Sequence, residues 1–216
     1  MMLRLRALLL LVAAGLVGAC ALMLTGRVSS FHVLDATPRS FVLVPITDQQ
    51  ESLEFRTYAG MVRDQLIARG WKEAPLASAD AAVFLQYQIS QGRQVAFSYP
   101  IFGQVPTGSS TTTGSVSTYG NTASFNATTT QQTTVGVVGT GTGSRTEFDR
   151  AVRLTMFSVP AYRESGRMER LYEGEIRSTG STGDLPAVMP ALIRGLLEEF
   201  PGTSGSSRSV TLSIQK

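Results

Sequence analysis

The chain has 216 residues, of which 43% are hydrophobic and 16% charged, with one cysteine and a formal net charge of +3. This length fits one domain with an ordinary hydrophobic core, and one cysteine excludes an intramolecular disulfide. A basic chain can indicate nucleic-acid binding. However, two arginines lie in the first 19 residues, and without them 17 basic and 16 acidic side chains remain. We therefore expect no nucleic-acid partner.

The N-terminal residues have the pattern of a secretion signal that ends at a lipid attachment site. Two arginines precede an apolar run over residues 7–16, and the small residues Gly18 and Ala19 stand directly before Cys20. These are the parts of a signal peptide, and the small pair before a cysteine resembles the bacterial lipobox. Residues 1–19 are therefore predicted to be a lipoprotein signal peptide, cleaved between Ala19 and Cys20, with an acylated Cys20 thiol.

Acylation of Cys20 would anchor the chain in the lipid bilayer, with residues 20–27 as a short tether. One alternative is a small buried cysteine. Another is an uncleaved membrane helix, because the apolar run extends over residues 7–24, about 18 residues and the lower limit of a membrane span. Ala21 follows the cysteine where an aspartate would direct retention, which resembles the sorting pattern of outer-membrane lipoproteins. We expect a location on the outer membrane, facing the periplasm.

Hydrophobic periodicity predicts six strands and two helices in the order β-β-α-β-β-β-α-β. The strands are expected over residues 28–34, 40–46, 80–99 with a bulge at 91–93, 148–159, 171–178 and 210–214, and the helices over residues 53–70 and 185–199. The predicted fold class is α+β, with a largely antiparallel sheet and two helices packed on one face. Residues 28–216 would form this single domain.

A long uncharged segment interrupts the domain. Residues 94–144 include no charged side chain, and residues 107–146 are mostly Thr, Ser, Gly, Gln and Asn. One interpretation is a flexible low-complexity insertion over about residues 104–146. Another is a long hairpin, because Thr and Ser suit strands. The uncharged edge of such a hairpin could recruit a strand from an envelope protein, or bind glycan.

The sequence contains no strong motif for a cofactor, a metal ion or catalysis. The pattern Gly-Thr-Gly-Thr-Gly over residues 139–143 has neither the lysine nor the strand–loop–helix context of a phosphate loop. His32 is the sole histidine, and we expect it to be a structural strand residue, because the partners of a metal or hydrolase site are missing. Trp71 at the end of the first helix is expected to pack in the core.

Glu173 and Glu175 are the carboxylates that could perform acid–base chemistry on a sugar. Their spacing of two places both on one face of a strand. Arg177 follows on the same face, so a solvated ion-paired surface is the simpler interpretation. The two carboxylates are kept as the alternative, in which the protein is an enzyme acting on envelope glycans.

Several segments of the domain together form a recognisable pattern: Phe31-His32-x-Leu34, Phe41–Pro45, Ser52–Tyr58, Ala68–Trp71, Ala79–Val83, Leu171–Gly174 with Arg177-Ser178, Val188–Ile193 and Phe200–Gly202. These segments resemble a family of bacterial lipoproteins, the domain-of-unknown-function family 4136. The resemblance covers most of residues 28–215 outside the uncharged segment. It implies an envelope lipoprotein with an α/β domain, and it implies no activity and no catalytic residues.

The sequence therefore predicts a non-enzymatic, membrane-anchored interaction or structural module of the cell envelope. Its expected partners are the bilayer, through Cys20, and an envelope protein or glycan. The alternatives are the glycan-acting enzyme that uses Glu173 and Glu175, and a lipoprotein that binds a small ligand in the groove between the helices and the sheet.

Overall fold

A computed structural model of the protein describes residues 22–35 and 39–214. The predicted signal peptide over residues 1–19, with its Ala19–Cys20 cleavage site, lies outside the described residues. The chain divides into two compact units. The first, here called the sheet domain, is formed by the described parts of Met1–Arg93 and Glu147–Lys216. The second, here called the arm, is Gln94–Thr146.

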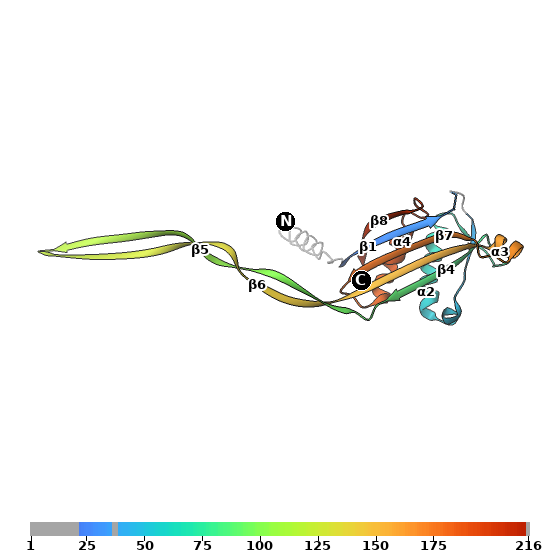
Figure 1. The fold of residues 1–216 in the computed structure, drawn as a ribbon, viewed down its shortest axis with the longest axis horizontal. Coiled ribbons are helices and arrows are strands. Elements are labelled where there is room, and N and C mark those ends of the chain that lie inside the picture. Colours follow the sequence, from blue (N-terminus) through green and yellow to red (C-terminus); the bar gives the residue numbers. More distant parts are fainter. Residues whose placement is uncertain (1–21, 36–38, 215–216) are drawn as a thin grey trace, which may run out of the picture. The chain divides into compact units, whose positions relative to one another are not determined.

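The described strands form one eight-stranded sheet in the order β3-β2-β4-β6-β7-β1-β8, with β5 paired to β6 (Figure 1). The strands are β1 (Leu22–His32), β2 (Ser40–Leu43), β3 (Lys72–Glu73), β4 (Ala81–Ile89), β5 (Arg93–Tyr119), β6 (Thr122–Ser158), β7 (Arg170–Gly180) and β8 (Ser206–Ile214). The neighbouring pairs from β4 to β8 are antiparallel. The pairs β2–β3 and β2–β4 are parallel, so the sheet is mixed.

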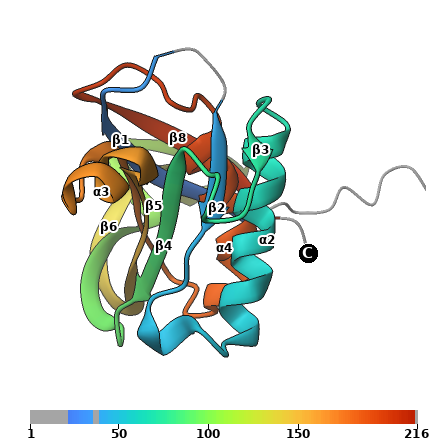
Figure 2. The same ribbon diagram turned by 90° about the vertical axis from the view of Figure 1, so that its right-hand side faces the viewer.

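Three α-helices occur in the described residues: α2 (Leu53–Ile67), α3 (Val159–Ser165) and α4 (Leu185–Leu197), besides the short 3₁₀ helix η1 (Thr47–Gln49). Figure 2 shows α2 and α4 on one face of the sheet and α3 on its other side. The α2 helix starts at Ser52, whose Oγ accepts a hydrogen bond from the backbone N–H of Phe55 at 3.1 Å. That bond satisfies one of the unpaired donors at the helix start.

The main core lies between the sheet and the two helices α2 and α4. Val152, Leu154 and Met156 alternate along β6 and are fully buried, at 0% exposure. They belong to one cluster with residues of α2 and α4, such as Val62 and Leu192. The intervening residues of β6 point to the other face, because successive side chains of a strand alternate. Most of that second face is polar and open, as is common for antiparallel sheets.

The predicted fold class is wrong, because the protein is mostly β. The sheet is mixed, since α2 connects β2 to β4 as a crossover, which makes these strands parallel. The helix α3 was not predicted; it follows directly on β6, where Ser158 caps its start and Pro160 occupies its first turn. The uncharged segment belongs to the two longest strands, β5 with 27 residues and β6 with 37. It forms a hairpin and not a flexible insertion.

The first strand also starts earlier than expected. We predicted a tether through residue 27 and a strand from residue 28, whereas β1 begins at Leu22. Residues 22–27 pair with β8, and Leu24 is buried. Leu24 thus serves the core of the sheet domain, and the first strand begins two residues after the predicted anchor at Cys20.

Candidate functional site

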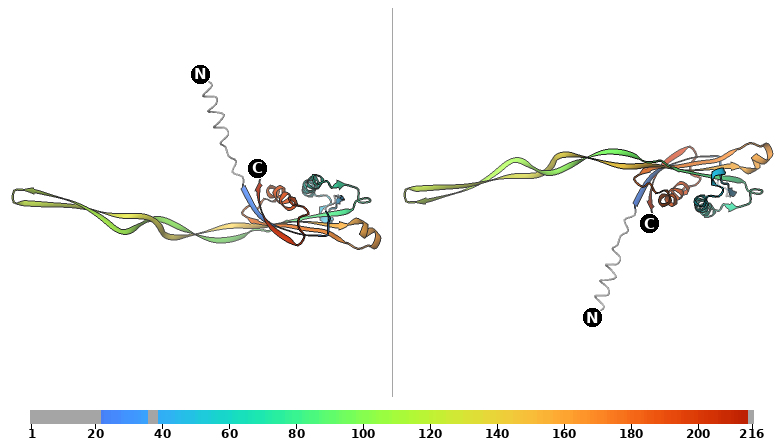
Figure 3. Two further views of the ribbon diagram at one scale, coloured as in Figure 1. Left: turned by 90° about the horizontal axis from the view of Figure 1, so that it is seen from above. Right: turned by 90° about the horizontal axis from the view of Figure 1, so that it is seen from below.

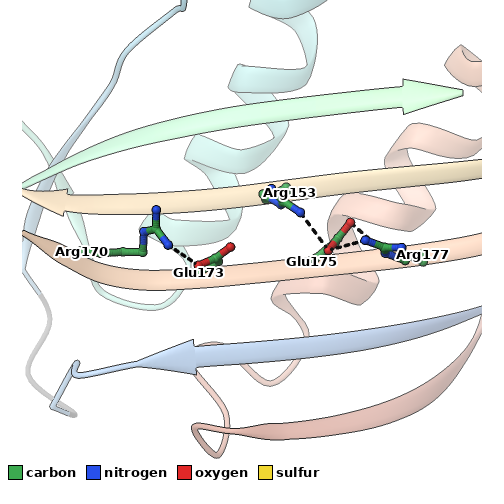
Figure 4. Close-up of polar contacts among 5 residues, drawn as sticks. All are labelled: Arg153, Arg170, Glu173, Glu175 and Arg177. Atoms are coloured by element: carbon green, nitrogen blue, oxygen red, sulfur yellow. Dashed lines mark hydrogen bonds and ion pairs between the residues drawn. The ribbon is translucent and has the colours of Figure 1, made fainter. Parts of the chain in front are cut away.

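The two carboxylates singled out in the sequence lie on the open face of β7, each bound to arginine (Figure 4). Glu175 Oε1 accepts from Arg177 Nε at 3.0 Å, and its Oε2 accepts from Arg153 Nη2 of the neighbouring strand β6 at 3.3 Å. Glu173 Oε2 accepts from Arg170 Nη1 at 2.6 Å. The structure thus places both carboxylates on one face, as predicted, in cross-strand and same-strand ion pairs.

These ion pairs determine the acidity of Glu175. Burial raises the pKa of its carboxyl, but the hydrogen bonds and charges of Arg177 and Arg153 lower it more, so the pKa lies below its ordinary value. A general acid in glycoside hydrolysis needs the opposite shift, because it must hold a proton near neutral pH. The geometry therefore gives the enzyme alternative no support and fits an ion-paired surface of the sheet.

His32 and Trp71 both occupy structural positions. His32 Nε2 lies 3.1 Å from the carbonyl oxygen of Gly202. Ser204 Oγ contacts the backbone of His32 at 2.8 and 2.9 Å and not the ring nitrogens, so no serine–histidine pair is formed here. Trp71 is buried, with edge contacts to Phe41 and Phe200 at ring distances of 6.4 and 5.7 Å.

The arm is a two-stranded hairpin with a tight turn at its tip. Gly120 has a φ of +61°, and Gly at the first central position is typical of the type II′ hairpin turn. Hydroxyl pairs connect the two strands, Thr112 to Thr129 and Ser117 to Ser124, each at 2.9 Å. Figure 3 shows the strands twisting about each other, as two-stranded ribbons do.

Aromatic rings cover glycines near the base of the arm. A Cβ atom at Gly141 would lie 2.6 Å from the ring of Tyr99, and one at Gly143 would lie 2.9 Å from the ring of Phe97. Arg145 lies over the Phe97 ring at 5.7 Å. The glycine pattern over residues 139–143 therefore lies within strand β6 and makes room for rings on β5.

Apart from Arg145 near its base, the arm has an uncharged surface, and its outer edges are open. Within the described strands, β5 pairs with β6 only, so along the arm each strand has one edge without a neighbour. Several large apolar side chains are exposed there, namely Val116, Tyr119, Phe125, Val135 and Val137. An edge of this kind, without charged side chains to protect it, is a template for another strand.

A second feature of the surface, here called the apolar groove, lies beside α3 in the sheet domain. It has a volume of about 670 Å³ and is lined mainly by apolar side chains, including Val44, Leu76, Ala82, Phe84, Phe157 and Met168. Sequence analysis missed it, because these residues come from five separate segments. A usable signal was the apolar run over residues 81–85, which indicates a strand covered on both faces.

Comparisons with known proteins reveal little about the chain. No family model matches the sequence, and no curated protein matches it. A crystal structure of a PDZ domain protein from Parabacteroides distasonis resembles it with a TM-score of 0.44 and 10% identity, over 89% of this chain and 40% of that one. The chain thus spans less than half the length of that protein. The resemblance to domain-of-unknown-function family 4136 stays a prediction.

Two features are absent from the described residues, a membrane-spanning helix and a cluster of metal-binding side chains. None of their helices combines the length and the apolar character needed to cross a membrane. Over the same ranges, 22–35 and 39–214, histidine, cysteine, aspartate and glutamate side chains do not gather in groups of three or more that could hold a metal ion.

Proposed function

We propose that this protein is a non-enzymatic lipoprotein of the outer membrane, whose arm binds another envelope protein by strand addition. The observation that supports this most is the arm itself, a two-stranded unit with uncharged, open edges. An isolated two-stranded hairpin is marginally stable in water. A third strand would satisfy the backbone groups along an outer edge and add cross-strand contacts.

The partner should be an extended and largely uncharged segment. Residues 94–144 of the arm offer no charged side chain, so an acidic or basic segment would bury its charges there without a counterion. The exposed Val116, Tyr119 and Phe125 would favour apolar or aromatic side chains at alternate positions of the partner strand. The exposed rings could instead bind a glycan, and crosslinking from Phe125 distinguishes a protein partner from a glycan.

The start of β1 and the junctions of the arm lie at the same end of the sheet domain. Cys20 precedes Leu22 by two residues, which span at most about 7 Å. The sheet register aligns Gly26 with Ser178, and Ser178 with Arg150. This places the beginning of β1 near the points where the arm joins the domain, Arg93 and Glu147. An acylated Cys20 would therefore hold the origin of the arm close to the bilayer, where other envelope proteins are anchored.

Site-specific photo-crosslinking in cells tests the proposal. A benzophenone amino acid in place of Phe125, which is 71% exposed in the arm, should give one repeatable protein adduct. The matched control is the same substitution at Leu53, which is 73% exposed in the sheet domain and should not give that adduct. Equal adducts from both positions, or none from Phe125, would count against the proposal, and capture of glycan alone would replace the protein partner.

Deletion of the arm gives an independent measure of its role. Arg93 Nη2 and Glu147 Oε2 lie 3.4 Å apart, so a two-residue Asn-Gly turn can replace Gln94–Thr146 and close the sheet domain. The shortened protein should keep its thermal unfolding transition and lose the co-purifying partner. Retention of the partner would show that the arm is not the binding element.

A further inference from the structure

We propose that the apolar groove beside α3 binds a free fatty acid, with the acyl chain along the groove and the carboxylate at Arg163. The groove lies wholly within the sheet domain, so this inference is separate from the role of the arm. Its volume of about 670 Å³ is in the range of small-molecule sites. It lies on the face of the sheet opposite α2 and α4, and not between the helices and the sheet, where the sequence alternative put a ligand.

The walls of the groove are apolar and partly exposed to solvent. Phe84 of β4 and Phe157 of β6 form the floor, in edge contact at 5.7 Å. Leu76, Tyr162 and Met168 stand around it with more than half of their surface exposed, at 55%, 54% and 54%. A patch of large apolar side chains on an otherwise polar surface indicates a binding site, whereas single exposed apolar side chains do not. A flexible methionine suits a chain of variable shape.

The lack of polar groups favours an acyl chain over a peptide. Ser158, Tyr162 and Arg163 are the polar lining side chains, and Ser158 Oγ already accepts a bond from the backbone N–H of Ala161 at 3.2 Å. Near the groove β4 pairs with β2 and β6, and β6 pairs with β4 and β7, so neither strand offers an open edge. A peptide would leave its backbone amides unsatisfied, whereas a hydrocarbon chain has none.

Arg163 supplies the charge that a carboxylate would need. Its Nη2 donates to the backbone carbonyl of Leu76, which holds the guanidinium at the rim between α3 and the Leu76 loop. A guanidinium has five N–H donors in a fixed fork, and most of them remain for a ligand. The next arginine, Arg170, is bound to Glu173 and lies over the Phe157 ring at 5.7 Å. A guanidinium at the rim of an apolar groove fits a single anionic head.

The predicted anchor on Cys20 is too far away to fill the groove itself. Leu22 pairs with Ile214 at one end of β1, and His32 pairs with Tyr172 at the other. The groove lies at the His32 end, because Phe157 pairs with Arg170 there. Ten residues of strand extend about 33 Å, whereas an acyl chain that fills one leaflet of a bilayer extends about 15 Å. The occupant is therefore a separate molecule.

Fluorescence titration with cis-parinaric acid tests the proposal on the full chain carrying Cys20→Ser, which leaves every described residue in place. The probe should bind at one site and be displaced by palmitate. Ala82→Phe fills the groove and should weaken binding at least about tenfold. Ala151→Phe, on the same face of the sheet outside the groove, is the control and should bind normally. Met168→Asp, at an exposed rim position, should also weaken binding if Ala82→Phe fails to fold.

Arg163→Gln tests the contribution of the ligand's carboxylate separately from that of its acyl chain. It should weaken palmitate about tenfold and leave the uncharged alcohol of the same length unchanged. Absence of saturable probe binding would overturn the proposal, and so would equal binding by wild type, Ala82→Phe and Met168→Asp. Displacement of the probe by an apolar peptide but not by palmitate would assign the groove to a peptide instead.

Discussion

At the scale of single residues, Glu175 is a carboxylate of the open face that two arginines hold in place. Arg153 on β6 pairs with it across the strands and Arg177 lies two residues further along β7, with ion-pair distances of 3.3 and 3.0 Å. The Glu175 side chain is only 16% exposed. Charge-assisted bonds to a half-buried group of this kind contribute more than ion pairs in open solvent.

We predict that Glu175→Gln lowers the free energy of unfolding by about 1–2 kcal/mol at pH 7. The folded pKa of Glu175 lies below its ordinary value, so its stabilisation is complete above the unfolded pKa of about 4.3. It is lost as the pH falls through the lower folded pKa. Urea unfolding of wild type and variant should therefore differ at pH 7, and the difference should shrink as the pH falls below the ordinary range for this group.

Glu173→Gln is the matched control, because Glu173 has one arginine partner and its side chain is 33% exposed. Glu173→Gln should lower the free energy of unfolding by less than about 1 kcal/mol at pH 7 or below. If both substitutions lower the free energy of unfolding equally at pH 7, the two arginine partners of Glu175 stabilise the fold no more than the single partner of Glu173. A complementation defect with both variants stable would instead revive the glycan-acting alternative.

At the scale of elements, the arm depends on rings packed over glycines. We predict that Gly141→Ala opens the base of the arm, because the new Cβ would lie 2.6 Å from the Tyr99 ring. That ring is 48% exposed, so it can swing away, and the arm loses a cross-strand contact. The loss of such a pair, about 0.5–1 kcal/mol, should speed amide hydrogen exchange around residues 97–101 about threefold.

Gly139→Ala provides the comparison within the same glycine pattern. A Cβ atom there meets nothing within 4 Å, and alanine restricts the unfolded chain more than glycine does. Exchange in this variant should be unchanged or slower. Faster exchange in both variants would show that the strand, and not the ring contact, is sensitive to any side chain.

The elements show which parts of the fold a sequence can predict. Alternation indicated a strand over residues 148–159, which lies almost wholly within β6, and helical spacing indicated a helix over residues 53–70, where α2 lies. Both patterns are local, so periodicity is sufficient. The composition of the arm could not decide between coil and hairpin, since Thr and Ser suit both; the turn at Gly120 and the pairing of β5 with β6 decide it. The start of β1 was missed because its apolar residues continue the run before Cys20.

At the scale of the whole molecule, the strand topology and the surface sites were harder to predict from the sequence. The parallel pairing of β2 with β4 depends on the crossover through α2, which strand patterns do not report. The apolar groove is assembled from segments between Val44 and Met168 that lie far apart in the sequence, so no local motif marks it. Glu173 and Glu175 were correctly placed on one face, but their arginine partners Arg153 and Arg170 come from pairing and turns that only the structure shows.

The predicted anchor concerns the whole molecule, since it would decide where both the arm and the groove can act. We predict that Cys20→Ser abolishes palmitate labelling and releases the protein from the membrane fraction. The thermal unfolding transition should stay unchanged, because the described fold begins at Leu22. Ala21→Ser keeps the cysteine and should remain labelled and membrane-bound. Loss of the label with full retention in the membrane would favour an uncleaved membrane helix, confined to the residues before β1, which begins at Leu22. Labelling that survives Cys20→Ser would rule out the lipoprotein anchor.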